Sequence, residues 1–518
     1  MSGLRNLFGD VRKPHPIRGA KVTTAQYDPD EDLKTFGYSQ QLRRSMGGYS
    51  SFALAFSMIS ITTCIFTLFG QPFQMIGGVA IWLWVLATAG IVVIAAVYGH
   101  LAARLPVTGY AYQWSSRLVN PHYGWFTGWN ALLATLVGSA SIAIAFGTVF
   151  APDFFSTPSH GDVILLASIA TIVAVGVNVI SIRLTSRTND VGASVELFGT
   201  LGLTAVLGVG IIFFHHVAGP SVLTQVKSST GGNVNLTSVG LALLLPVYTL
   251  LGWEGSADLA EETTDPRGMA PKAMIRSCLI SGIAGFVVFA ILAMAIPGNI
   301  NTTVNSTTFN PVVHLFQVHF GGGGSDAIQV VAFISIFSCL LANITVATRT
   351  GFALGRDNML PGSAIWSKVH PVTRTPIITI IAVGLVTIGV NFLSSGEAAK
   401  VTAIVAIVCM ITYATSMVAV LISNRRGGIP AAEAGRFDLG RWLIPLTLIG
   451  LGWSIVVVLF MTLPDINHTA GEYTVYFELA GVIWYFAALR RRLQRGTAGP
   501  FREQKGAADL APATSADS

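Results

Sequence analysis

Five carboxylates lie close together in the stretch GWEGSADLAEETTDP, residues 252 to 266, directly after an apolar run. An acid beside an apolar segment is costly to bury in its ionised form, so it usually faces a cavity and binds a proton or a cation there. On a helix the first four share a face but span about 12 Å of depth, so their roles should differ. Glu254 and Asp258 are candidates for binding a proton. The other three, Glu261, Glu262 and Asp265, are expected to form ion pairs, with Arg267, Lys272 and Arg104 as available partners.

The chain has the composition of an integral membrane protein. Of its 518 residues 52% are hydrophobic and 11% are charged, and the mean hydropathy is +0.63. Apolar windows of about 20 residues, each with at most one charged residue, are long enough to cross a bilayer as α-helices. We predict an all-α polytopic membrane protein with twelve transmembrane helices. The windows lie near residues 48–70, 78–99, 125–150, 163–182, 197–214, 236–253, 274–297, 327–348, 376–394, 401–423, 442–463 and 473–489.

The positions of lysine and arginine predict the orientation. Of the 31 such residues, all but Lys227 and Lys400 fall on one side of the predicted bilayer when the N-terminus is placed inside, and cytoplasmic segments carry this excess. We expect both termini in the cytoplasm, with tails at residues 1–44 and 491–518 and a transmembrane domain at residues 45–490. The net charge of +6 then reflects membrane orientation, and no nucleic-acid partner is expected.

The sequence lacks the motifs that several classes of protein need. The ten histidines show no HxxxH or HExxH spacing and the four cysteines no CxxC, so we expect buried free thiols, no metal site and no cofactor. No GxxxxGK phosphate loop is present, which disfavours an ATP-driven pump. No nucleophile with a base and no repeated filter is visible, which disfavours an enzyme and a channel.

The predicted outer loops have two features of their own. They hold four sequons, at Asn235, Asn301, Asn305 and Asn467, which ordinary polar loop residues also explain. They also hold the run Gly321 to Gly324, which we expect to be a flexible connector.

Two predicted spans contain residues that interrupt a helix. In the first span, the segment SMISITTCIF, residues 57 to 66, offers several hydroxyls that compete with the backbone for hydrogen bonds. In the sixth, Pro246 removes a backbone donor and Gly252 loosens the helix. Transporters built on inverted repeats often have discontinuous helices at matching places in both halves. Spans 1 and 6 lie five apart and cross in opposite directions, so they fit this pattern.

Four motifs resemble one known family. The set Gly252-Trp253-Glu254, Glu261-Glu262-Thr263, Asp265-Pro266 and Pro271 is similar to the end of span 6 in the amino acid–polyamine–organocation superfamily. Further segments that resemble it are HLAARLPVTGYAYQW from His100, TRTGFALGRDNMLP from Thr348 with the following Arg374-Thr375-Pro376, and GYSQQLRRSMGGYSSFALAFSMIS from Gly37. The last is similar to the start of the amino acid/choline transporter branch. The resemblance covers about residues 37 to 490.

The resemblance implies a fold of five plus five spans in an inverted repeat, with two extra helices. Repeat one would cover about residues 48–216, repeat two about 236–423, and the extra helices about 442–489. The family commonly has Gly where Cys64 stands, and Asp and His where Glu254 and Asp258 stand. Cysteine lacks the φ freedom of glycine, which implies a milder unwinding of span 1, and two acids in place of an acid and a histidine imply a different preferred charge of the substrate.

The resemblance also implies a permease rather than an enzyme. We expect a secondary active transporter in the plasma membrane that imports an amino acid, or a related amine such as 4-aminobutyrate, by alternating access coupled to protons. The lipid bilayer and the small substrate are its expected partners. A choline or polyamine transporter, a sodium-coupled transporter, an exchanger and a substrate-sensing transceptor of the same fold stay open.

The substrate is expected between the two breaks. Amides after a break near Thr63 would face a carboxylate at the positive end of a half-helix, and carbonyls near Leu250 would accept from an ammonium. Trp253 would cover the substrate or stack on its cation, unless it is a packing or lipid-facing residue. The predicted substrate-binding residues are Ser60, Thr62, Thr63, Cys64, Ile65, Phe66, Thr249, Leu250, Leu251 and Trp253.

Three acids are candidates for proton coupling: Glu254, Asp258 and Glu196. For Glu196, near the inner end of span 5, the alternative is a structural ion pair with Arg183 or Arg187. A sodium site would instead use hydroxyls and free carbonyls of spans 1 and 8. The span 8 candidates are Ser335, Ser338, Asn343, Thr345 and Thr348.

Overall fold

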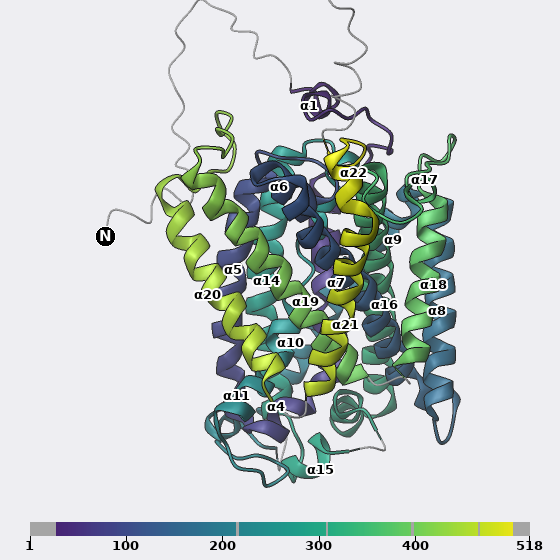
Figure 1. Cartoon of the computed structure of the whole chain (residues 1–518). Helices are drawn as coiled ribbons and strands as arrows, with labels where there is room; N and C mark the ends of the chain where they lie inside the picture. The colour runs from purple at the N-terminus through teal and green to yellow at the C-terminus, as the bar shows by residue number, and fades with distance from the viewer. Residues whose placement is uncertain (1–26, 214–216, 307–308, 395–397, 465–466, 501–518) are drawn as a thin grey trace, which may run out of the picture.

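The structure, a computed structural model, is a bundle of helices. It describes residues 27–213, 217–306, 309–394, 398–464 and 467–500. Long helices stand side by side, and short helices lie at both ends of the bundle (Figure 1). Within the described residues the chain forms no named β-strand.

The predicted membrane crossings all fall on helices. Nine segments of the described chain are long and apolar enough to span a membrane. They are formed by α2–α3 (Gly48–Ile59, Ile61–Leu68), η2–α5 (Gly78–Ile81, Trp82–Ala102), α7 (Pro121–Phe154), α8 (His160–Ile180), α9–η3–α10 (Ile182–Ser194, Val195–Thr200, Leu201–Gly210), α14 (Pro266–Met294), α16 (Pro311–Arg356), α19 (Ala398–Arg425) and η6–α20 (Gly440–Trp442, Leu443–Thr462). The remaining windows hold α11–α12 (Leu236–Ala242, Leu244–Thr249), α18 (Ile377–Leu393) and α21 (His468–Trp484). The prediction of an all-α polytopic membrane protein is confirmed.

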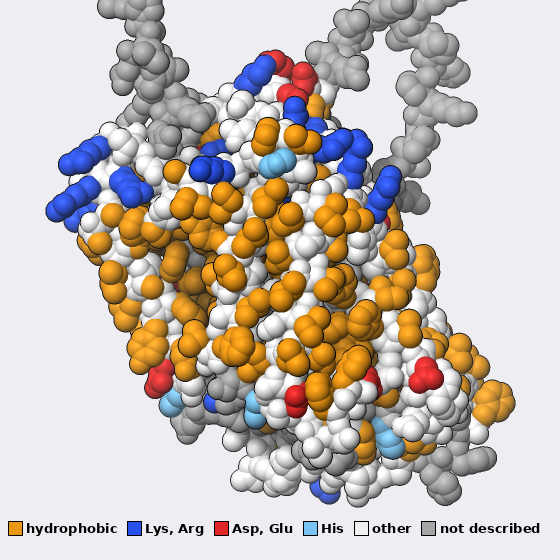
Figure 2. All heavy atoms as spheres, turned by 90° about the vertical axis from the view of Figure 1, so that its right-hand side faces the viewer, with side chains coloured by type: hydrophobic (Ala, Val, Ile, Leu, Met, Phe, Trp, Pro, Cys, Tyr) orange, Lys and Arg blue, Asp and Glu red, His pale blue; other side chains and the backbone are white. Residues whose placement is uncertain are grey.

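Short helices and charge distinguish the two ends of the bundle. One end carries α1 (Pro29–Thr35), α6 (Tyr110–Leu118), α17 (Ser363–Trp366) and α22 (Arg490–Gln494). The other carries α4 (Gly70–Met75) and α15 (Ile300–Val304). Figure 2 shows lysine and arginine gathered at the first end, above a broad hydrophobic band. We call this first end the basic end; its charge is the kind that the positive-inside rule assigns to a cytoplasmic face.

The burial of the helices distinguishes the centre of the bundle from its rim. The α7 span is 94% buried, whereas the spans of α8 and α20 are each only 28% buried. An exposed apolar helix is stable in lipid because all its backbone groups are bonded within the helix. The residues that can form an internal site therefore come from α7 and its neighbours.

Spans 1 and 6 lie side by side and cross in opposite directions. At the basic end the amides of Ser45 and Met46 each donate to the Glu262 carbonyl at 2.9 Å. Towards the other end, the Gln71 side-chain amide donates to the Leu241 carbonyl at 2.8 Å. This antiparallel pairing of two spans is the arrangement that the inverted-repeat pattern predicts.

The glycine run of span 8 differs from its prediction. Residues Gly321 to Gly324 lie inside α16 and do not form a flexible connector. The helix is kinked at Gly321, where φ is 67° and ψ is −163°. Glycine adopts this conformation without the penalty that a Cβ brings. The helical backbone is interrupted at Gly321, so α16 consists of two helices that meet at this kink.

Candidate functional site

Span 1 is broken at a single residue, Ser60. Helix α2 ends at Ile59 and α3 begins at Ile61, with Ser60 between them at a φ of 32°. A positive φ is strained for any residue with a Cβ. The Ser60 hydroxyl offsets part of this cost because it accepts from the Thr63 amide at 3.3 Å and so caps α3.

The predicted position of this break was wrong by three residues. We expected it near Thr63, with the amides of Cys64, Ile65 and Phe66 free. The Cys64 amide instead donates to the Ser60 carbonyl at 3.3 Å, and the other two residues lie inside α3. The amides at the open end of α3 are those of residues 61 to 63.

Span 6 is broken where its glycine predicts. Helix α12 ends at Thr249, Gly252 has a φ of 95°, and the next helix, α13, spans Gly255–Asp258. A Cβ added at Gly252 would lie 2.9 Å from the Cβ of Met58, so glycine also permits the close approach of span 1. Among the described residues, the carbonyls of residues 249 to 251 accept no hydrogen bond.

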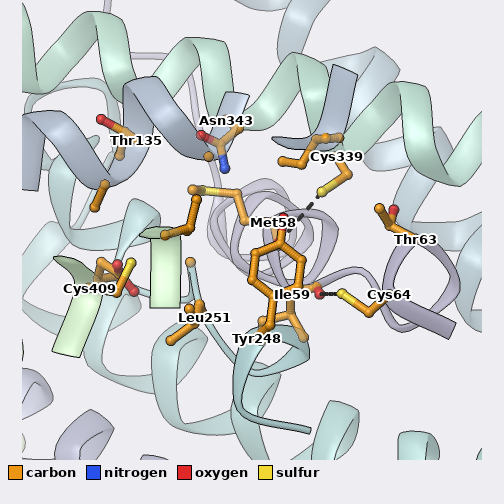
Figure 3. Close-up of a pocket in the computed structure, with 16 residues that line it drawn as sticks. Met58, Ile59, Thr63, Cys64, Thr135, Tyr248, Leu251, Cys339, Asn343 and Cys409 are labelled. Carbon is orange, nitrogen blue, oxygen red and sulfur yellow. Dashed lines mark hydrogen bonds between the residues drawn. The ribbon is translucent and has the colours of Figure 1, made fainter. Parts of the chain in front are cut away.

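A cavity lies between the two breaks (Figure 3). Its volume is about 40 Å³, which is room for a few water molecules. Spans 1, 3, 6, 8 and 10 supply its walls. The lining residues are Met58, Ile59, Thr63, Cys64, Ala134, Thr135, Gly138, Ile142, Tyr248, Leu251, Gly252, Glu254, Cys339, Asn343, Val405 and Cys409.

Some of the predicted substrate-binding residues line this cavity and others do not. Thr63, Cys64 and Leu251 are in its walls. Three more line a smaller cavity with Thr200 of span 5; they are Thr62, Ile65 and Phe66. Ser60, Thr249 and Leu250 lie at the two breaks and line neither cavity.

Trp253 points into an aromatic cluster. Its ring is fully buried, stacks on Tyr413 at a centroid distance of 5.3 Å and meets Tyr98 edge-on at 5.2 Å. Trp253 is absent from the walls of the cavity, whereas the adjacent Glu254 lines it. In this state the indole packs directly beside the cavity and does not cover its interior.

Sequence reasoning missed the cavity walls from spans 3 and 10, which are apolar or small residues. Asn343 of span 8 is different, because an amide in an apolar span is a visible signal. Its side chain accepts from the Ser139 hydroxyl at 3.2 Å, and it lines the cavity together with Thr135 (Figure 3). A Cβ on Gly138 would lie 3.3 Å from the Asn343 oxygen, so this glycine lets span 3 approach the amide.

Three of the four cysteines line the cavity. The prediction of buried free thiols is confirmed, since all four are free and buried. Two of the thiols are directed at the end of α2 (Figure 3): Cys339 donates to the Met58 carbonyl at 3.6 Å and Cys64 to the Ile59 carbonyl at 4.0 Å. These thiols occupy carbonyls that the break would otherwise leave free.

Glu254 is the charged residue of the cavity. It is 4% exposed, and its Oε2 accepts from the Tyr413 hydroxyl at 2.8 Å. The lining residues include no other carboxylate and no Lys, Arg or His. A ligand in this cavity therefore meets an acid and backbone dipoles, and no basic side chain.

Glu196 lies behind the wall of the cavity, at the open end of α3. The π-helical turn η3 carries it, and such turns often occur at functional sites. Its Oε1 accepts from the Thr62 amide at 3.0 Å and from the Ser60 hydroxyl at 3.1 Å. The Ser60 hydroxyl also lies 2.6 Å from the Thr63 hydroxyl, and Thr63 lines the cavity. Two hydroxyls thus connect Glu196 to the cavity.

Glu196 does not form the ion pair that was its alternative role. In the described part of the chain it has no ion pair with Arg183 or Arg187. Its carboxylate instead occupies the positive end of a half-helix, a position that favours negative charge.

A family model described as amino acid permease matches residues 46–487. The chain belongs to the amino acid permease family. Amino-acid permease BAT1 of Arabidopsis thaliana is 24% identical over 502 residues, which cover 88% of this chain and 94% of that relative. Amino-acid permease 2 of Neurospora crassa is 23% identical over 484 residues, covering 89% and 88%. The protein is thus a membrane transporter of amino acids and not an enzyme.

The carboxylates beyond Glu254 close the basic end of the permease. Asp258, fully buried, accepts from the Gly109 amide at 2.6 Å and from the Thr350 hydroxyl at 2.9 Å, and it does not line the cavity. Glu261 forms two bonds to Arg356, at 2.9 and 3.0 Å. These contacts join the end of span 6 to span 8 and to the loop after span 2.

The predicted partners of the acidic stretch were wrong. Glu262 pairs with Arg349 at 2.7 Å, and Asp265 pairs with Arg436 at 2.8 Å. The expected partner Arg267 instead binds Asp32. The expected partner Arg104 binds Asp438 at 2.8 Å, and Lys272 faces a groove on the outside of the bundle. The observed partners are arginines of span 8 and of the loop before α20.

Segments outside the spans reinforce this closure. The N-terminal segment before α2 docks on the basic end, where the Tyr38 hydroxyl donates to Asp357 at 2.8 Å and Asp32 pairs with Arg267 at 2.7 Å. Burial raises the pKa of Asp357, although Arg356 acts in the opposite direction. In the loop before α20, the backbone amide of Gly440 holds the pKa of Asp438 below its usual value of 3.8.

The described residues of the permease contain no cluster of three or more His, Cys, Asp or Glu side chains placed to hold a metal ion. The two breaks, the cavity and Glu254 form the candidate site. It can offer free carbonyls and a carboxylate to a cationic group, and hydroxyls and a helix N-terminus to an anionic one.

Proposed function

We propose that this permease imports an amino acid, or a related amine such as 4-aminobutyrate, by alternating access, with its basic end in the cytoplasm of a cell bounded by the plasma membrane. The observation that carries the proposal is the cavity between two broken, antiparallel spans. Freed backbone groups at such a midplane site replace the hydration of a small charged substrate.

The substrate's ammonium group is assigned to span 6. The carbonyls of residues 249 to 251 accept no hydrogen bond within the described chain, and the Glu254 carboxylate lines the same cavity. An unpaired acceptor buried away from water is costly, so an ammonium that donates to these carbonyls gains more than it would on the surface.

The substrate's carboxylate is assigned to α3. Its N-terminus carries the positive end of the helix dipole, and Thr63 presents a hydroxyl to the cavity. Glu196 already binds the Thr62 amide on the far side of α3. A carboxylate in the cavity would therefore be recognised by the cavity side of this helix end, near Thr63.

Proton coupling is assigned to Glu254, because it is the lone acid in the cavity wall and is nearly sealed from water. An ionised acid at this depth favours either a bound cation or a proton. A proton on Glu254 would remove its charge and allow the loaded cavity to open to the other side. Glu196 is the second candidate, because two hydroxyls connect it to the cavity.

Uptake by proteoliposomes tests the coupling. A panel of labelled amino acids and 4-aminobutyrate first identifies a substrate by counterflow, and uptake is then measured against external pH. We expect wild-type uptake to rise as the external pH falls, and Glu254→Gln to lose this dependence while retaining counterflow. Glu478→Gln is the matched control, because Glu478 of α21 lies outside the cavity and binds Asn130.

The outcomes separate the two acids. Unchanged pH dependence in Glu254→Gln would overturn its assignment. If Glu196→Gln alone loses the dependence, the coupling belongs to Glu196. Wild-type uptake that requires sodium and ignores pH would exclude both acids as proton-coupling residues and favour a sodium site at spans 1 and 8.

An amine without a carboxylate is the second candidate substrate. The cavity wall contains one acid and no base, so a choline or a polyamine would meet the same carbonyls and the same carboxylate. Competition decides between the classes: inhibition of uptake by choline, with no inhibition by zwitterionic amino acids, would refute the carboxylate site at α3. A chain that binds substrate but shows no counterflow would be a sensor.

A further inference from the structure

A groove of the permease lies on its outside, at the basic end between α2 and α14. Its volume is about 350 Å³, and none of its residues lines the central cavity. Helix α2 contributes one wall and α14 the other. The lining residues are Gly48, Tyr49, Phe52, Met269, Lys272, Ala273, Arg276 and Ile280.

Two positive charges line this groove without a protein partner. Lys272 and Arg276 lie one turn apart on α14, both are exposed, and neither forms an ion pair within the described chain. No carboxylate is among the lining residues. Elsewhere at the basic end Arg267, Arg349 and Arg356 are each paired with an acid. The groove therefore has positive charge that no carboxylate among its lining residues neutralises.

The rest of the groove is apolar and extends towards the centre of the bilayer. Ile280 lies one turn beyond Arg276, so Lys272, Arg276 and Ile280 descend on one face of α14 at about 6 Å per turn. Phe52 and the half-exposed Tyr49 face them from α2. Long cationic side chains at such a depth extend towards the interface and keep their stems on apolar surface. The groove thus has its positive charge towards the basic end and its apolar surface towards the centre of the bilayer. A phospholipid has its charged headgroup and its acyl chains in the same order.

We propose that this groove binds the headgroup of an acidic phospholipid, with the phosphate on Lys272 and Arg276 and an acyl chain along Phe52 and Ile280. Basic pockets between transmembrane helices on the cytoplasmic side suit such headgroups. A soluble anion would be attracted by the two cations but would make no contact with the apolar wall. The lipid would lie against α2, the half of span 1 that ends at the Ser60 break.

Lipid binding to the purified full-length permease tests this site. Native mass spectrometry measures retention of palmitoyl-oleoyl-phosphatidylglycerol and of the corresponding phosphatidylcholine. The variant Lys272→Gln/Arg276→Gln removes both charges but keeps long side chains on the apolar wall. Since a cation near the membrane surface contributes about fivefold to binding of an anionic lipid, the double variant should bind phosphatidylglycerol about thirtyfold more weakly. Retention of phosphatidylcholine should not change.

Two further variants keep the test decisive. Arg425→Gln/Arg426→Gln removes two exposed cations at the end of α19, outside the groove, and should retain phosphatidylglycerol like the wild type. Lys272→Arg/Arg276→Lys keeps both charges and should also retain it, which separates lost charge from misfolding. Equal loss in the α19 variant would refute a specific groove. Displacement of the lipid by inorganic phosphate alone would show an anion site without lipid recognition and would overturn the proposal.

Discussion

The pair of Glu262 and Arg349 gives a sharp test of how the basic end is held closed. Glu262 is fully buried and Arg349 is 1% exposed. The Glu262 Oε1 accepts from two guanidinium nitrogens, at 2.7 and 3.1 Å. Removal of one partner of a buried pair leaves an uncompensated charge, which costs about 3–5 kcal/mol. We therefore expect Arg349→Met to destabilise the permease by about that amount.

The double variant should behave differently. The second carboxylate oxygen of Glu262 and one nitrogen of Arg349 have no partner in the described chain. The interactions within the pair therefore offset only part of the free energy that removing both charges from water costs. Replacement of such a pair by apolar side chains of similar volume is often neutral or stabilising by about 1–4 kcal/mol. We expect Glu262→Met/Arg349→Met to be at least as stable as the wild type.

The assay is equilibrium unfolding in mixed micelles with increasing sodium dodecyl sulfate, followed by tryptophan fluorescence for the four members of the mutant cycle. Arg436→Met is the control, because its pair with Asp265 is partly exposed and should contribute about 0–1 kcal/mol. A double variant that is destabilised by the sum of the two single changes would refute the reasoning, since it would show that both residues act independently.

Three further changes probe the breaks and the basic end. Gly252→Ala puts a Cβ at a φ of 95° and 2.9 Å from a side chain of α2, which costs about 1–2 kcal/mol for the backbone alone. Uptake by this variant should fall. Gly176 has open space around it, so the control variant Gly176→Ala should transport normally. Asp32→Asn loses the pair with Arg267 and should lower the unfolding free energy by about 1–3 kcal/mol, while counterflow affinity stays unchanged. The pKa of Asp438 is lowered in the folded protein, so the ionised carboxylate stabilises the fold at pH values above its usual pKa of 3.8. This stabilisation is lost as the pH falls through the lowered pKa. The difference in unfolding midpoint between the wild type and Asp438→Asn should therefore vanish in acid.

The spans and one of the two breaks were predictable because each depends on local chemistry. An apolar window of about 20 residues without charge generally forms a membrane-spanning helix. At Gly252 only a residue without a Cβ can take the observed φ and the close approach of span 1, and the preceding Pro246 marks the same region. The sequence therefore contained both the position of the break and its physical cause.

The break of span 1 was less predictable. Several hydroxyl residues surround it, and each can cap a new helix in the same way. What selects Ser60 is the Glu196 carboxylate, which binds its hydroxyl from another span. A contact between residues 136 positions apart leaves no periodic signal in the sequence. The same reason explains the wrong partners of the acidic stretch, whose arginines lie 87 and 95 residues away in span 8.

The acidic stretch that follows Gly252 joins the candidate site to the closure of the basic end. Glu254 lines the cavity, whereas Asp258, Glu261 and Glu262 bind span 8 or the loop after span 2. Only short helical turns separate these residues, and the side chains of Asp258, Glu261 and Glu262 hold them to span 8. Movement of this segment would change the cavity wall and the ion pairs together. One stretch of span 6 thus contributes both to the cavity wall and to the ion pairs of the basic end.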